Sequence, residues 1–97
     1  MPLAHVAQAQ GTYVVEYLAG LQPPLLDYDS VPRAVYADPQ VASIGLTEEQ
    51  AMERGNKVKT GRFPFLANGK ALAMGNYEGF AKVVIEAETG ELLGAHL

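Results

Sequence analysis

Cysteine does not occur anywhere in the 97 residues of this chain. Its absence excludes disulfide scaffolds, CxxC redox chemistry, thiolate nucleophiles and the common structural zinc sites. Positive charge is scarce as well, because seven Lys and Arg residues stand against eleven Asp and Glu residues. Proteins that bind nucleic-acid phosphates carry a basic stripe, so we expect no nucleic-acid partner.

Long apolar runs and nucleotide-binding motifs are also missing. No stretch of about 18 apolar residues occurs, and no basic segment precedes an apolar one at the N-terminus. We therefore expect a soluble, cytoplasmic chain with no membrane partner. The sequence contains no GxGxxG motif, which excludes a complete dinucleotide-binding unit. Its two histidines, His5 and His96, lie near opposite ends, so we expect neither a catalytic residue nor a metal ligand.

The N-terminal stretch has the pattern of an amphipathic helix. Apolar residues recur every three or four positions between residues 2 and 19. Pro2 suits the first helical turn, and Gly20 suits the position after the last one. Gly11 lies inside this stretch, where glycine costs about 1 kcal/mol relative to alanine. We expect Gly11 to mark close packing against another element.

The next stretch, residues 21–32, predicts a linker. Its proline pair at residues 23–24 and its acidic residues follow neither a helical nor a strand period. Pro32 also disfavours helix at the residue before it. This stretch is the most plausible domain boundary in the chain.

Beyond Pro32 the apolar period changes to two, which is typical of strands. Thr47 and Gln50 have the spacing of a capping box that starts a short helix ending near Gly55. We expect residues 68–75 to form a turn and one helical turn at most. The expected strands cover residues 33–37, 41–45, 57–65, 80–87 and 91–97. The fold class is therefore α+β, an N-terminal helix followed by an antiparallel β-sheet with a short helix.

Three places in the sequence raise the question of a binding or catalytic site. The Gly69-Lys70 pair lacks the upstream glycine and the following hydroxyl of a phosphate-binding loop, so we interpret it as an ordinary Asn-Gly turn. His96 lies in a strand pattern, where a packed or half-exposed side chain is the common case. His5 lies near a helix start, where unpaired N–H groups suit a phosphate or a polarised carbonyl.

Four segments of the chain together resemble one known family. They are VPRAVYADPQVASIGLTEEQA (residues 31–51), FPFLANGKA (63–71), GFAK (79–82) and TGELLGAH (89–96). In this order they closely resemble the C-terminal dimerisation domain of FAD-dependent pyridine nucleotide-disulfide oxidoreductases. The resemblance covers essentially the whole chain. It implies that residues 1–20 are the last helix of an FAD domain, residues 21–32 a linker, and residues 33–97 part of the dimerisation domain.

The resemblance also implies a cofactor contact. In this family the segment similar to Leu3, Ala4 and His5 opens a helix whose backbone amides lie against the pyrimidine edge of the flavin. The family usually has Met where this chain has Pro2, and proline donates no N–H. The full-length parent would use FAD and NAD, but we expect neither to stay bound to this chain.

Several parts of the family pattern are not found in the chain. The redox cysteine pair and the N-terminal nucleotide-binding folds are missing, and the family's His-Glu acid-base pair would lie beyond Leu97. The last apolar stretch reaches Leu97 without a turn, so we expect the natural continuation to be missing and the chain to be inactive alone.

Self-association is the expected behaviour of such a chain, as a homodimer or larger assembly, or assembly with the rest of a split parent enzyme. We expect the following apolar side chains to be left exposed to solvent in this chain: Phe80, Val83, Val84, Ile85, Leu92, Leu93 and Leu97. The alternative is a stand-alone α+β interaction module without catalytic activity.

Overall fold

A computed structural model describes residues 3–97 of the chain. The described chain forms two compact units, residues 3–31 and residues 32–97. Among the described residues, no helix is both long and apolar enough to cross a membrane.

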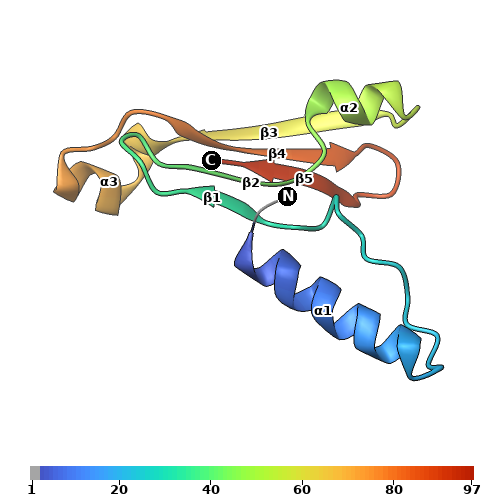
Figure 1. Cartoon of the computed structure of the whole chain (residues 1–97). Coiled ribbons are helices and arrows are strands. Elements are labelled where there is room, and N and C mark those ends of the chain that lie inside the picture. The colour runs from blue at the N-terminus through green and yellow to red at the C-terminus, as the bar shows by residue number, and fades with distance from the viewer. Residues whose placement is uncertain (1–2) are drawn as a thin grey trace. The chain divides into compact units, whose positions relative to one another are not determined.

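The first unit consists of helix α1, Ala4–Leu18, and an extended segment that follows it (Figure 1). The helix ends as expected, because Gly20 adopts the left-handed conformation with φ of +79°. Pro2 lies outside the described residues. The expectation for Gly11 is wrong, since nothing lies within 4 Å of the position that a Cβ would occupy. The contact with the following segment comes instead from Gln10, whose Nε2 donates to the Tyr28 hydroxyl at 2.9 Å.

The second unit is a five-stranded antiparallel sheet in the order β1-β2-β5-β4-β3 (Figure 1). Its strands are β1 (Arg33–Val35), β2 (Val41–Gly45), β3 (Val58–Pro64), β4 (Phe80–Glu86) and β5 (Leu92–His96). All five strands expected from the sequence are present within two residues of the expected bounds, so the α+β class is confirmed. Pro64 ends the edge strand β3, where a missing N–H does not interrupt the sheet.

Helix α2, Glu48–Glu53, starts with the capping box that the sequence predicts. The Thr47 hydroxyl accepts from the Gln50 N–H at 3.2 Å, and the Gln50 side-chain oxygen accepts from the Thr47 N–H at 3.0 Å. Glu48 and Glu49 lie in the first turn, where negative charge complements the helix dipole. Gly55 follows the helix with φ of +86°.

The segment after β3 is more helical than expected. A short 3-10 helix, η1 (Phe65–Ala67), leads into α3, Gly69–Met74, whose six residues exceed the single turn predicted from the sequence. Asn68 caps α3 by accepting from the Ala71 N–H at 3.0 Å, and Gly75 closes it at φ of +70°. Strong helix formers between these two caps explain the extra length.

The β4–β5 hairpin turns at Gly90, which has φ of +77°. The Glu86 carboxylate accepts from the N–H groups of Thr89 and Glu88, each at 2.7 Å. The bond from Thr89 is the main reason that the pKa of Glu86 is lowered from its ordinary value. The turn is therefore held by an ionised carboxylate at its base.

The apolar core of residues 32–97 lies between α2 and the sheet. Its buried side chains are those of Leu46, Ala51 and Val84. Val58 and Leu93 pack against this cluster. Leu93 is the extra residue of a β-bulge, since Val84 and Ile85 of β4 face Gly94 and Leu92 of β5.

Removal of the cap hydroxyl tests the start of α2. We expect Thr47→Ala to lower the free energy of unfolding by about 0.5–2 kcal/mol, because the Gln50 N–H loses its acceptor. Chemical denaturation measures the change, with the exposed α1 variant Thr12→Ala as control. An unchanged midpoint for Thr47→Ala would mean that the box does not form in solution.

Two glycines give opposite expectations for the same substitution. A Cβ on Gly94 would lie 2.1 Å from the Leu46 carbonyl oxygen, whereas one on Gly11 meets nothing within 4 Å. We expect Gly94→Ala to destabilise the chain by about 3 kcal/mol or more. Gly11→Ala should stabilise it by about 0.5–1 kcal/mol, because alanine is the better helix former. Equal unfolding midpoints for the two variants would contradict this packing.

Candidate functional site

The sheet has one face that α2 covers and one that no helix of the second unit covers. Residues directly opposite each other in an antiparallel pair point to the same side, so the register assigns each side chain to a face. Figure 1 shows α2 on one side of the strands. The other side, here named the open face, carries Ala34, Ala42, Ile44, Lys59, Gly61, Phe63, Ala81, Val83, Ile85, Leu92, Ala95 and Leu97.

The open face is apolar except for Lys59. Phe63 and Leu97 are 50% and 51% exposed. Small residues alternate with larger ones, since Ala95 lies between Ile44 on β2 and Val83 on β4. Burying one large apolar side chain against a partner is worth about 1.5–3 kcal/mol. This face therefore suits association with another apolar surface.

The open face differs in part from the apolar set expected to be left exposed to solvent. Val83, Ile85, Leu92 and Leu97 do lie on it. Phe80 does not, because it lies on the other face beside Arg62. The expectation is wrong for Val84, which is 0% exposed in the core cluster with α2. Leu93 packs against the same cluster because of the bulge.

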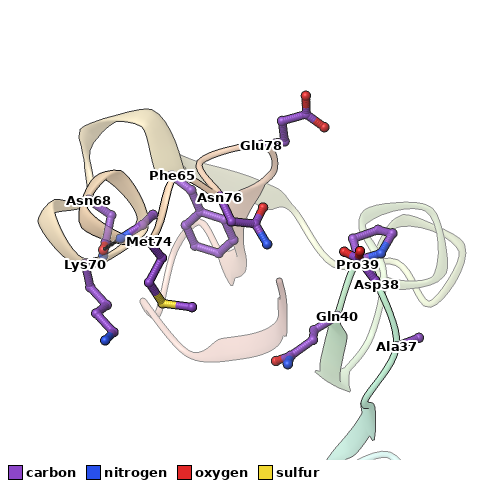
Figure 2. A pocket seen from close by; sticks show the side chains of 11 residues that line it. Ala37, Asp38, Pro39, Gln40, Phe65, Asn68, Lys70, Met74, Asn76 and Glu78 are labelled. Atoms are coloured by element: carbon purple, nitrogen blue, oxygen red, sulfur yellow. Dashed lines mark hydrogen bonds between the residues drawn. The ribbon is translucent and has the colours of Figure 1, made fainter.

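A cleft of about 560 Å³ lies between the β1–β2 turn and the segment from η1 to Glu78. Figure 2 shows Phe65, Met74 and Asn76 on one side of it and Asp38 and Gln40 on the other. The charged ends of Lys70 and Glu78 point away from the cleft in this view. Sequence reasoning missed this cleft, because its two walls are about 25 residues or more apart and meet only through the sheet.

A smaller hollow of about 300 Å³ links this cleft to the open face. It shares Gln40 and Phe65 with the cleft and is also lined by Ala34, Ala42 and Leu97. The open face and the cleft therefore form one continuous surface in the second unit.

The three residues expected to bind cofactor lie together at the start of α1. Leu3 is the N-cap, with extended backbone and no side-chain cap bond, and Ala4 and His5 follow in the first turn. Ala4 and His5 are exposed, and the first turn carries no acidic residue. N–H groups of a first helical turn lack intrahelical acceptors, so this end can receive an electron-rich atom.

His96 is a half-buried sheet residue, in keeping with the ordinary interpretation of its sequence pattern. Its Nε2 donates to the Leu46 carbonyl oxygen at 3.0 Å and so ties β5 to the start of α2. Within residues 3–97, no group of three or more His, Asp or Glu side chains could hold a metal ion.

Comparison with known proteins gives a consistent result. Residues 31–97 match the model for the pyridine nucleotide-disulphide oxidoreductase dimerisation domain. The chain is 54% identical over 97 residues to dihydrolipoyl dehydrogenase from Chlorobaculum parvum, covering 100% of this chain and 21% of that protein. It is 47% identical over 97 residues to dihydrolipoyl dehydrogenase from Bacillus subtilis, covering 100% of this chain and 20% of that protein.

A solved structure agrees with these sequence matches. The HOCl-induced flavoprotein disulfide reductase RclA from Escherichia coli superposes with a TM-score of 0.85 at 28% identity, covering 100% of this chain and 22% of that chain. The chain thus spans about a fifth of the length of the curated relatives that it matches.

Proposed function

Since the chain belongs to the pyridine nucleotide-disulphide oxidoreductase family through its dimerisation domain, we propose that it supplies the subunit contact of a dihydrolipoamide dehydrogenase. The observation that carries this proposal is the open face, an apolar sheet surface inside the matched residues 31–97. Residues 33–97 would act as dimerisation domain, residues 21–32 as linker, and residues 1–20 as the last helix of an FAD domain.

The parent reaction would be the oxidation of protein-bound dihydrolipoamide by NAD, through FAD and a disulfide. FAD would carry the electrons between the disulfide and NAD. This chain holds no cysteine and so cannot form that disulfide itself. Its part would be to bring two subunits together, and we propose that it has no turnover alone.

The start of α1 would contribute one contact to the flavin. The N–H groups of Leu3, Ala4 and His5 are the donors that we propose for the pyrimidine edge. The uncapped first turn without acidic residues supports this, because its partial positive charge complements the electron-rich edge. An aspartate or a glutamate there would compete for the same N–H groups.

A stand-alone interaction module is the second candidate. It is favoured by the second unit, which forms a five-stranded sheet with its own capped helix. An upstream reading frame that encodes a glycine-rich strand-turn-helix and paired cysteines would favour the first proposal, that the chain is part of an enzyme. Absence of such a reading frame would favour the stand-alone module.

Flavin retention tests the proposal that this chain contributes a flavin contact but does not hold the cofactor alone. We expect the purified 97-residue chain to be colourless, because a contact along one edge cannot hold a cofactor without sites for its adenine and pyrophosphate. Visible absorbance and protein mass after gel filtration measure the stoichiometry. A yellow one-to-one FAD complex would falsify the proposal as stated.

Light scattering tests the role of the open face. We expect a dimer or larger species at high micromolar concentration, and we expect Ala95→Glu to shift it toward monomer by placing a carboxylate in the apolar contact. Ala87→Glu is the matched control, since it adds the same charge at an exposed residue beside the β4–β5 turn.

Two results would contradict this role. One is a monomer at high micromolar concentration with cooperative unfolding, which would favour the stand-alone module. The other is equal behaviour of the Ala95→Glu and Ala87→Glu variants, both with the circular dichroism spectrum of the parent chain.

A further inference from the structure

The face of the sheet that α2 partly covers carries one transverse line of polar side chains. The register places Arg33 opposite Ser43, Ser43 opposite His96, His96 opposite Lys82, and Lys82 opposite Arg62. These residues, here named the basic row, come from all five strands. With strands about 4.8 Å apart, the row extends about 19 Å.

Three cations in this row are an unusual concentration for a chain with a net charge of −4. Arg62 and Lys82 lie directly opposite each other, and like charges in that position destabilise a sheet. Only part of this repulsion is offset. The Lys82 Nζ pairs with Glu48 Oε2 at 2.6 Å, and the Arg62 guanidinium lies 3.7 Å from the centre of the Phe80 ring.

Two of the cations keep their charge available. Arg33 is exposed and forms no ion pair within residues 3–97. Arg62 is also exposed, and its Phe80 contact leaves its charge uncompensated. The single carboxylate on the row, that of Glu48, neutralises Lys82 alone. The row therefore carries a net positive charge of about two, because Arg33 and Arg62 keep their charges and only Lys82 is paired with a carboxylate.

An apolar margin runs along the side of the row that is away from α2. Val35 and Val41, paired in register, are 58% and 52% exposed there. On the other side α2 carries Glu49 and Glu53, which repel an approaching anion. A negatively charged partner would therefore lie over the row and the two valines.

We propose that the basic row is a docking site for an acidic, partly apolar segment of another protein. The cations are spread along a line and do not converge on one point, as donors to a phosphate would. Carboxylates three or four residues apart on a helix repeat at about 5–6 Å, close to the strand spacing. This inference does not rest on dimerisation, because the open face lies on the other side of the sheet.

Fluorescence anisotropy of the full chain tests the proposal. The probe is a fluorescein-labelled octapeptide of glutamate and leucine, and its counterpart carries glutamine in place of glutamate. We expect binding of the acidic probe only, weakened by added salt. Arg33→Gln and Arg62→Gln should each weaken it about fivefold. Arg33→Lys, which keeps the positive charge, should bind the acidic probe as well as the unchanged chain does.

The control variant is Lys59→Gln, which removes one positive charge from the open face of the same sheet. Equal loss in Lys59→Gln and Arg33→Gln would overturn the proposal, because net charge alone would then explain binding. Equal binding of the glutamine probe would also overturn it. Competition by tripolyphosphate at lower concentration than the unlabelled acidic peptide would assign the row to phosphates and so overturn a protein partner. Circular dichroism verifies that each variant is folded.

Discussion

The close approach of Leu46 to the backbone of β5 is the constraint on which the second unit depends. Gly45 and Gly94 are paired in register, and a Cβ on either would meet backbone atoms at 2.2 Å or less. This space lets the Leu46 N–H donate to the Leu93 carbonyl oxygen at 2.8 Å. It also brings the Leu46 carbonyl oxygen within reach of His96. The chain can then leave β2, enter the capping box and lay Ala51 over Val84.

Because α2 is short, it covers only one end of one face. The rest of the sheet has two faces with different side chains, since alternate residues of each strand point to opposite sides. One side carries the basic row, and the other is almost wholly apolar. A domain of this size buries little apolar surface alone. Membership of a dimerisation family is therefore in keeping with a sheet that has so much uncovered apolar surface.

Local features of this fold could be predicted from the sequence, whereas features that depend on distant pairing could not. The capping box at Thr47 and the turn at Gly90 follow from residues within four positions of each other. The strand order requires contacts between residues about 50 apart, such as Ser43 and His96, and no local pattern specifies it. For the same reason neither the cleft nor the basic row was predicted. A helix over residues 2–19 was predicted, and α1 covers Ala4–Leu18. The cofactor proposed for its start came from family resemblance and not from the chemistry of the residues.

The place of β5 in the sheet also bears on how the chain reaches this structure. Strand β5 follows the other four strands in the sequence but lies at the centre of the sheet, with β2 on one side and β4 on the other. A growing polypeptide can form the β1–β2 and β3–β4 hairpins early, because each pairs neighbours in the sequence. Until β5 is synthesised, each hairpin has an inner edge with unpaired backbone groups that any other extended strand can bind. Cooperative formation of this sheet must therefore wait for β5, and chains released before β5 is made are the species most exposed to aggregation.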